Sequence, residues 1–516
     1  MAGSALNNVA SQAGNNLNYN SGQQSYSSSA TGSGVYTTST ALDTSSGSPR
    51  SSSMINKQSN NAPIPVLYGK QRLGGTRVFV ASSNGTGTPQ SLTPEGEWAN
   101  TEFLNVVITI SEGEMGQIQE LYFNETVVWD SNAGGTFASR AANKGEELLN
   151  FIAPWDSISG MRMFYYNGTT TQDRCDELTA SINTWNNGTP DPGDVPTLSG
   201  IAYIVAKLPV DEVFGGNLPT MTVVTEGKDI LDVSGMTAGT APYTTTVSGE
   251  DQNPVDVMYD YLTSDKFGKG LDRDYAEVNG VITSTRNRGR DIDLPSFKQA
   301  RIHCDAARGG LGYPFNGFLP TGNRLFDNVQ MILDMCNGML LFIDGKYHMR
   351  IRRKDEQLSI PAYGVFTTAD IMSSIALTLP SKTSKLNKAI GVYGSEESSW
   401  NDDLVVYAPF SYLEQDGLTV LEHKQEYSLI TDKQFVTDLI QQKVDYSRDS
   451  EVITFTTSHR ALELRAGEVI EVQNPDYGWG TGAGETRRYW RVIEITINED
   501  NTVDISAAAY DSGLEL

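Results

Sequence analysis

The stretch from Asn323 to Arg353 constrains the fold more than any other part of the chain, because it has the pattern of a helix that leads directly into a hairpin. Asn323 is the predicted N-cap, since its side-chain oxygen can accept a hydrogen bond from a free N–H of the first turn. The apolar residues that follow recur at helical spacing and predict one buried stripe, namely Leu325, Val329, Ile332, Leu333 and Cys336. Gly338 stands where the end of a helix favours a left-handed residue.

The hairpin is marked by Asp344-Gly345, which is the strongest two-residue turn signal. Residues 339–343 before the turn form a short apolar strand. The return strand alternates, with Tyr347, Met349 and Ile351 on one face and His348, Arg350 and Arg352 on the other. This pattern predicts a scaffold that offers no pocket, no nucleophile and no cluster of metal ligands.

The composition indicates a large acidic protein. A chain of 516 residues has room for roughly three or four domains. Only 38% of its residues are hydrophobic, so its cores are diluted by polar sequence. The formal net charge is −25, and a surface of that sign repels nucleic acid. Binding of DNA through phosphate contacts is not expected, because that mode requires clustered Lys and Arg. Sequence-specific binding of nucleic acid is not expected either. An acidic lumen would instead keep passing DNA from adhering.

The cysteines and histidines give no sign of a metal site, a cofactor or a disulfide framework. Three cysteines and four histidines are scattered along the chain, and none of them are paired at the spacing of metal ligands. The N-terminus lacks the apolar core of a secretory signal. No apolar run approaches the roughly 20 residues that span a bilayer, so no transmembrane segment is expected.

The chain divides into four predicted regions. Residues 1–60 are rich in Ser, Asn, Gly and Thr and form a low-complexity arm, either a linker or a segment that orders against a neighbouring subunit. Residues 61–227 are β-rich, with a strand meander over 61–130 and a possible insertion over 131–196. Residues 228–365 form an α+β domain with the helix–hairpin, and 366–516 combine one long helix with short strands typical of a small barrel or sandwich.

Further helices are predicted from local signals. Asn253-Pro254 starts one helix, because proline at the first helical position loses no hydrogen bond. A second helix is expected over 295–307, and a short one over 173–184. Thr431 and Gln434 fit a capping box at the start of the last long helix. The fold class is therefore α+β, β-rich and multidomain.

The sequence gives only weak evidence for catalytic groups. His303-Cys304-Asp305 places a base beside a thiol, but neighbours on a helix point in different directions, so a buried cysteine and a surface histidine explain it. Two pairs of carboxylates, Glu95 with Glu97 and Glu112 with Glu114, fall in or near predicted turns. A glycosidase would need its pair on either side of a cleft. No catalytic residue is assigned.

Ligand-binding motifs are equally weak. Asp274, Asp291 and Asp293 lack the pattern of a 12-residue calcium loop. The glycines at 309, 310 and 312 are not followed by the Lys-Ser/Thr of a phosphate loop, so they predict an ordinary loop. The one clear basic run comprises Arg350, Arg352, Arg353 and Lys354. It is either a solvated strand face or a contact with an acidic neighbouring subunit.

Several motifs taken together resemble the central tail hub proteins of long-tailed bacteriophages, of the lambda tail tip attachment type. The opening motif is Asn61-Ala-Pro-Ile-Pro-Val-Leu-Tyr-Gly69 with Gly74-Gly75-Thr-Arg-Val. The others follow in the family's order: Ala202–Leu208 with Pro219, Tyr261-Leu262 through Leu271, Met339 through Tyr347, Leu464–Ile470, Asn474–Trp479, Arg491-Val492-Ile493 and Ala508–Asp511. Together they cover most of residues 61–511.

The resemblance implies a structural virion protein of the phage tail, assembled in the host cytoplasm. It implies a homotrimeric hub in which small β-barrel or sandwich domains form a six-lobed ring, while inserted helix–hairpin domains close the distal end until DNA is released. Implied partners are the tail tube or distal tail protein, other tail tip proteins and the tape measure protein. The chain stops soon after Tyr510, where the lambda-type protein continues, so a separate fibre protein is expected to bind the receptor.

Two alternatives are a tail-associated glycan or peptidoglycan hydrolase and a receptor-binding adhesin. A hydrolase would require an acid–base pair across a cleft, and the sequence offers none that can be placed there. An adhesin would show tight binding of the purified protein to host cells.

Overall fold

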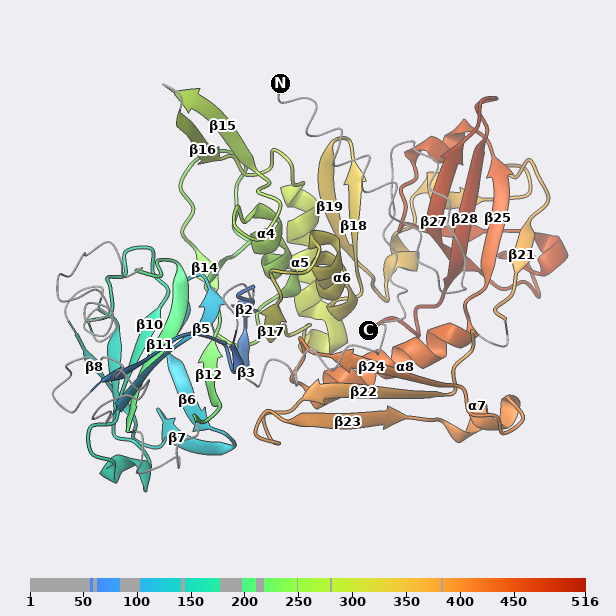
Figure 1. Cartoon of the computed structure of the whole chain (residues 1–516). Coiled ribbons are helices and arrows are strands. Elements are labelled where there is room, and N and C mark those ends of the chain that lie inside the picture. Colours follow the sequence, from blue (N-terminus) through green and yellow to red (C-terminus); the bar gives the residue numbers. More distant parts are fainter. Residues whose placement is uncertain are drawn as a thin grey trace. The chain divides into compact units, whose positions relative to one another are not determined.

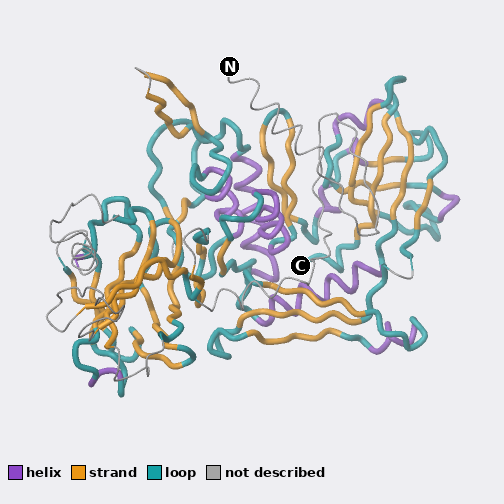
Figure 2. Tube along the Cα trace, viewed as in Figure 1, coloured by secondary structure: helices purple, strands orange, loops and turns teal. Residues whose placement is uncertain are grey.

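The computed structural model describes residues 56–58, 63–83, 103–140, 144–176, 197–209, 218–247, 249–278, 281–381 and 384–516. Contacts divide the chain into Met1–Gly34 and Val35–Leu516, and every described residue belongs to the second unit. The predicted arm therefore lies outside the described residues except for 56–58, as does most of the short helix expected over 173–184. The rest is the β-rich, multidomain α+β fold that was predicted, with many strands and few helices (Figures 1 and 2).

Two sheets that share a core form the first module. The seven-stranded sheet has the order β1 (Lys57–Gln58), β4 (Thr76–Ser83), β5 (Phe103–Glu112), β11 (Ile201–Pro209), β10 (Arg162–Asn167), β9 (Glu146–Leu149) and β8 (Thr136–Ser139). The four-stranded sheet has the order β3 (Lys70–Leu73), β12 (Met221–Glu226), β6 (Ile118–Phe123) and β7 (Thr126–Asp130). Apolar side chains from both sheets meet in one core, as in a β-sandwich.

The meander predicted over 61–130 is wrong at one step. β5 and β6 follow each other in the sequence but belong to different sheets. Both edges of β5 are already paired, one with β4 and the other with β11. No edge is therefore left for β6, and the chain crosses to the second sheet.

The central module gathers three helices around the predicted hairpin. The helices are α4 (Pro254–Thr263), α5 (Leu294–Gly310) and α6 (Leu325–Met335), and the hairpin strands are β18 (Gly338–Ile343) and β19 (Lys346–Ile351). The apolar stripe of α6 packs into the same core as residues of the other two helices, which confirms the helix–hairpin prediction. Small strand pairs surround this core: β2 (Val66–Tyr68) with β17 (Gly317–Leu319), β13 (Ile230–Leu231) with β14 (Thr246–Val247), and β15 (Arg273–Val278) with β16 (Val281–Arg286).

Two details of the helix–hairpin prediction are wrong. Arg324 rather than Asn323 is the N-cap of α6, and the Asn323 side chain instead donates to Asn328 Oδ1 at 3.2 Å. Asn337, with φ of 49°, takes the left-handed conformation expected at Gly338. Gly338 already belongs to β18, where a Cβ atom would come within 2.9 Å of Cys336 Sγ. Close packing, rather than the helix end, therefore requires this glycine.

A three-stranded sheet and α8 form the next module. The sheet has the order β23 (Asp402–Tyr407), β22 (Lys388–Gly394) and β24 (Glu422–Tyr427), with α7 (Phe410–Gln415) after β23, and α8 (Lys433–Arg448) packs on one face. A Cβ atom at Gly391 would lie 2.5 Å from Val436 Cγ1, so glycine lets α8 approach the sheet. The capping box predicted at Thr431 is wrong: Asp432 caps α8, because the Thr431 hydroxyl already accepts from Asn316 Nδ2.

The C-terminal sheet has six strands in the order β20 (Val365–Phe366), β26 (Val469–Val472), β27 (Tyr489–Ile497), β28 (Val503–Tyr510), β25 (Val452–Thr457) and β21 (Ala376–Thr378). An apolar core of its own includes Trp490, Phe455 and Phe366. Strands β25, β27 and β28 belong to the region in which the sequence predicted short strands. Short 3-10 turns occur at Trp155–Ser157, Glu356–Ser359, Ala362–Gly364, His459–Glu463 and Pro475–Tyr477.

Candidate functional site

The short β2–β3 segment, residues 66–73, contacts three modules at once, and we call it the junction hairpin. Its β2 half pairs with β17 beside the helices, and its β3 half pairs with β12 in the sandwich. Gly69 between them has φ of 67°, and a Cβ atom there would come within 2.2 Å of the Phe315 carbonyl oxygen. Only glycine fits such a turn, which explains one glycine of the opening motif.

Buried polar contacts attach the junction hairpin to the central module. The Gly69 N–H donates to Gln252 Oε1 at 3.0 Å, and the Lys70 N–H donates to Asn316 Oδ1 at 3.0 Å. The Tyr68 hydroxyl donates to Asp260 Oδ2 at 2.8 Å. Burial, helped by the Asp260 carboxylate, raises the pKa of Tyr68 well above its usual value. The phenol therefore stays a hydrogen-bond donor throughout the physiological pH range.

Arg72 connects the sandwich to the loop between β22 and β23. Its side chain is fully buried; it donates to Thr222 Oγ1 at 2.7 Å, to the Asn124 carbonyl at 2.8 Å and to the Ser399 carbonyl at 3.1 Å. The guanidinium also lies 3.9 Å from the ring centroid of Tyr122. A buried charge is tolerated only when it is hydrogen-bonded in this way, so Arg72 fixes the loop against the sandwich.

The loop that Arg72 holds is strained. Ser399 and Trp400 have φ of 54° and 67°, although neither is glycine, and such residues cost on the order of 1–3 kcal/mol each. Trp400 is 5% exposed and packs against Tyr122 and Val224. Lys70 adds an ion pair with Glu396 at 2.9 Å. The surrounding contacts therefore hold a conformation that the loop would not adopt by itself.

A second junction joins the helix–hairpin to the C-terminal sheet. Arg491 of β27 is nearly buried and contacts Glu356 at 2.6 Å and Glu515 at 2.7 Å. Burial opposes the charge of Arg491, but those two carboxylates raise the pKa of its guanidinium overall. The Tyr510 hydroxyl donates to the Arg353 carbonyl at 2.6 Å. These contacts fix the segment after β19 to the sheet.

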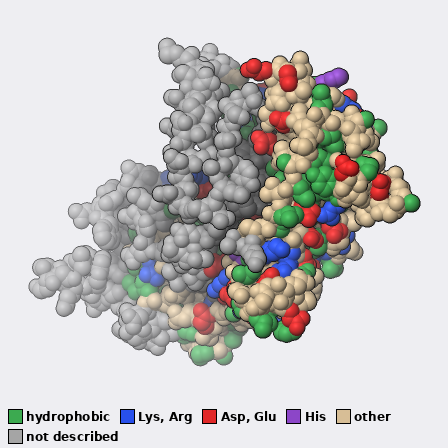
Figure 3. All heavy atoms as spheres, turned by 90° about the vertical axis from the view of Figure 1, so that its right-hand side faces the viewer, with side chains coloured by type: hydrophobic (Ala, Val, Ile, Leu, Met, Phe, Trp, Pro, Cys, Tyr) green, Lys and Arg blue, Asp and Glu red, His purple; other side chains and the backbone are tan. Residues whose placement is uncertain are grey.

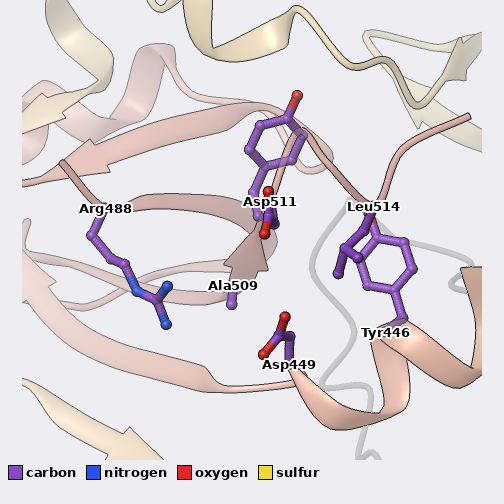
Figure 4. Close-up of a pocket in the computed structure, with 7 residues that line it drawn as sticks. Tyr446, Asp449, Arg488, Ala509, Asp511 and Leu514 are labelled. Carbon is purple, nitrogen blue, oxygen red and sulfur yellow. The ribbon is translucent and has the colours of Figure 1, made fainter. Parts of the chain in front are cut away.

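A shallow pocket lies at the C-terminal end of α8 (Figure 4). Arg488, Asp449 and Asp511 surround its opening, and Tyr446 and Leu514 lie on its other side. Arg488 forms an ion pair with Glu451, so its charge is already satisfied. The pocket is a surface feature of a junction between modules, and two carboxylates and a paired arginine line it.

The basic run is used partly inside the chain. Arg350 lies 3.8 Å from both Glu356 and Glu468, and burial lowers the pKa of its guanidinium. Arg353 pairs with Asp355 at 3.4 Å. The strand face is therefore not simply solvated, because Arg350 is partly desolvated at a junction between modules. The interpretation of the run as a solvated strand face is wrong for this residue.

The His303-Cys304-Asp305 triplet has separate roles. Burial, with a smaller effect of Arg353, lowers the pKa of His303 to about 4, and its Nε2 lies 2.8 Å from Gln299 Nε2. Cys304 is fully buried beside Cys336, and burial raises the pKa of its thiol. Asp305 pairs with Arg301 at 3.0 Å. Cys304 is buried as predicted, whereas His303, expected at the surface, is only partly exposed.

The carboxylates considered earlier do not converge. Glu95 and Glu97 lie outside the described residues, and Glu112 at the end of β5 faces Lys266 at 3.6 Å. Asp274 pairs with Arg290, and Asp293 caps α5. Over the described part of the chain, no group of three or more His, Cys, Asp or Glu side chains could hold a metal ion. In the same residues no helix is long and apolar enough to span a bilayer.

Sequence reasoning missed two buried charges. Asp272, fully buried, accepts from the backbone N–H groups of Gly289, Asp291 and Ile292 and so closes the base of the β15–β16 hairpin. Arg72 follows Gln71 in a short polar strand and has no periodic signal. Both side chains bond to backbone groups that lie far away in the sequence, so only the tertiary structure reveals what these residues hold together.

The chain was compared with known proteins. No model of a protein family matches it. The baseplate hub protein pb3 of Escherichia phage T5 is 20% identical over 489 residues, which cover 87% of this chain and 47% of that protein. The chain thus spans about half the length of the curated relative that it matches.

Solved structures were compared in the same way. A chain of the virion of a native gene transfer agent particle is 13% identical, with a TM-score of 0.52 over 89% of this chain and 87% of that chain, so the two share a fold. The 43 kDa tail protein of prophage MuSo2 from Shewanella oneidensis is 9% identical over 87% of this chain and 99% of its own length, but its TM-score of 0.28 carries no weight. The resemblance indicated by the motifs is confirmed: the chain is similar to a phage baseplate hub protein over most of its length and has the fold of a virion chain.

Proposed function

We propose that this chain is the central hub of a phage tail tip or baseplate and that it acts as a homotrimer. The observation that carries the proposal is the similarity to a baseplate hub protein over 87% of the chain. In this function the hub joins the tail tube to the distal tip and controls the passage of DNA. Its partners are the tail tube or distal tail protein, other tail tip proteins, the tape measure protein and a separate fibre protein.

The junctions support a mechanical role. A hub that transmits force between tube and tip must keep its modules in fixed positions. Here one eight-residue hairpin, 66–73, is tied to the sandwich, to the helices and to the β22–β23 loop by buried hydrogen bonds and by Arg72. Leaving any of these buried partners unpaired would cost about 1–3 kcal/mol, so the modules resist displacement.

The proposal divides the work among the predicted regions. Residues 61–227 and 366–516 are the two hub domains, so that three copies supply six lobes to match a sixfold tube. Residues 228–365 with the helix–hairpin close the distal end before DNA is released. The net charge of −25 suits a channel for DNA, because a surface of the same sign does not retain it.

We propose a structural role rather than an enzymatic one. The carboxylates that the sequence singled out, where the structure describes them, include Glu112 facing Lys266, Asp274 paired with Arg290 and Asp293 at the cap of α5. A glycan hydrolase needs an acid and a second carboxylate on either side of the bond. Incubation of the purified protein with host murein should release no soluble sugars, whereas turnover would favour the hydrolase.

Imaging and mass measurement test the hub directly. Tails that carry a tagged copy of the chain should show label at one end of the tail, where the tube meets the tip. Light scattering of the purified chain should give three times 56.2 kDa at micromolar concentration. Label along the tube or on the fibres would overturn the proposal, and a mass of one chain, both alone and with the tube protein, would overturn the trimer.

A further inference from the structure

The sheet of β22, β23 and β24 carries exposed apolar side chains on its outer face. Gly391 and Val405 lie opposite each other and face α8, so Leu404 and Val406 project from the other face. These two side chains are 57% and 54% exposed. Apolar side chains also lie at the surface around α7, which follows β23 and faces the viewer in the lower part of Figure 3. The solvent face of such a sheet is normally polar, so this composition indicates that another segment covers it.

The two edge strands of this sheet, β23 and β24, differ in their protection. The outward residues of β24 are Glu422, Lys424 and Glu426. Charged side chains of this kind keep edge strands from pairing with other chains. The corresponding positions of β23 hold Leu404 and Val406, and among the described residues no strand pairs with its outer edge. Strand β23 therefore has the edge that favours an added strand.

Residues 35–42 of the N-terminal arm have the composition of such a strand. Their sequence is Val-Tyr-Thr-Thr-Ser-Thr-Ala-Leu, which carries no charge and contains neither glycine nor proline. β-branched and aromatic residues favour strands, and no comparable run of them occurs elsewhere before Asn56. In an extended chain, alternate side chains share a face. The two faces would hold Tyr36, Thr38, Thr40 and Leu42 on one side and the smaller Val35, Thr37, Ser39 and Ala41 on the other.

The arm enters the described part of the chain close to β23. The Asn56 side chain donates to the Met221 carbonyl at 2.8 Å and accepts from the Met221 N–H at 2.7 Å. Val224, three residues further along β12, packs against Trp400, and β23 begins two residues after Trp400. Three residues of a strand span about 10 Å, whereas residues 43–55 can extend over about 45 Å. The tether is therefore long enough to bring residues 35–42 to β23 of the same chain.

We propose that residues 35–42 add a strand to the outer edge of β23 in the same chain. The two strands run antiparallel, because Leu42, the end of the segment nearest to Asn56, then lies beside the start of β23. The face that holds Tyr36 and Leu42 lies beside the exposed residues of β23, and the smaller side chains lie on the face that α8 covers. The added strand pairs the open edge and covers its apolar side chains. The arm fits better than a second copy or another protein, because every chain carries it and its tether ends beside this edge.

Cysteine cross-linking tests the pairing in the full-length chain. Leu404→Cys is combined in one chain with a cysteine at each position from 37 to 42 in turn, and the six variants are oxidised. We expect a disulfide within one chain for at least one of the positions 38, 40 and 42, because side chains directly opposite on one face lie about 4.5–5.5 Å apart. Positions 37, 39 and 41 belong to the other face and are the matched controls. The native cysteines Cys175, Cys304 and Cys336 are buried and should not interfere.

Hydrogen exchange tests the added strand without engineered cysteines. Thr37→Pro and Thr38→Pro are combined, because one of two successive N–H groups in a strand points towards the neighbouring strand and proline has no N–H. Peptides that cover 402–407 should then exchange about tenfold faster or more, because the outer N–H groups of β23 lose their acceptors. Ser28→Pro combined with Ser29→Pro changes the same arm outside the segment and is the matched control, in which exchange over 402–407 should not change.

The possible outcomes decide the proposal. Links within one chain that are confined to positions 38, 40 and 42, with faster exchange only in the variant at 37 and 38, support it. Links between two chains instead of within one overturn the assignment to the same chain. Linking at the level of the control positions, or equal exchange in the two proline variants, overturns the pairing itself. The hub proposal stands or falls separately, because its test is the position of the chain in the tail.

Discussion

Arg72 offers the sharpest test of how the modules are held together. Arg72→Met keeps much of the side-chain volume but removes three hydrogen bonds and the contact with the Tyr122 ring. Hydrogen bonds from charged groups contribute about 1.5–3 kcal/mol each but are not additive. The ion pair with Glu125 contributes little, because that carboxylate is 69% exposed. Only the bond to the Ser399 carbonyl reaches the loop, so we expect the loop contact to lose about 1.5–3 kcal/mol.

Hydrogen exchange is the suitable assay, because a chain of several modules does not unfold in one step. The Trp400 N–H donates to the Ser395 carbonyl at 2.8 Å and reports on the loop. A loss of about 1.5–3 kcal/mol should speed its exchange by about 10-fold to 150-fold, while peptides from the C-terminal sheet stay unchanged. Glu125→Gln is the control and should have little effect. Unchanged exchange over 395–401 in a folded Arg72→Met protein would refute the reasoning.

Three further predictions concern turns, titration and capping. Gly69→Ala should lower the Tm by several degrees or prevent folding, because its Cβ would meet a carbonyl oxygen at 2.2 Å. Gly345→Ala is the control and should cost only about 1 kcal/mol, because no atom lies within 4 Å of its Cβ. Equal losses of stability in the two variants would contradict this prediction. The pKa of His303 lies at about 4, below that of the unfolded chain, so its contribution to stability is present above pH 6.5 and is lost as the pH falls towards 4. Because His303 is only half-buried, the loss relative to His303→Gln should be about 1–2 kcal/mol, and a Tm difference independent of pH would speak against it. Asp432→Ala should cost about 1 kcal/mol and speed exchange in the first turn of α8, an effect that a cap at Thr431 would not produce.

The helix–hairpin shows what local sequence can decide. The stripe of α6 and the Asp344-Gly345 turn follow from spacing and from backbone preferences, and the structure has both. The same logic placed the start of α4, because Asn253 and Pro254 act within one turn. It failed for Asn323, whose side chain bonds to the side chain of Asn328 rather than to a backbone N–H, and for Thr431, whose hydroxyl accepts from Asn316, far away in the sequence.

The sequence by itself therefore determined the β-rich class, the main helices and the resemblance to tail hub proteins, since these depend on periodicity, turn chemistry and short motifs. Only the tertiary structure decided that β5 and β6 part into different sheets, that the 66–73 segment joins three modules, and that Arg72 and Asp272 are buried. The physical reason is that free strand edges and unpaired backbone groups are satisfied by partners far away in the sequence. No local pattern encodes which of those partners will lie within hydrogen-bonding distance.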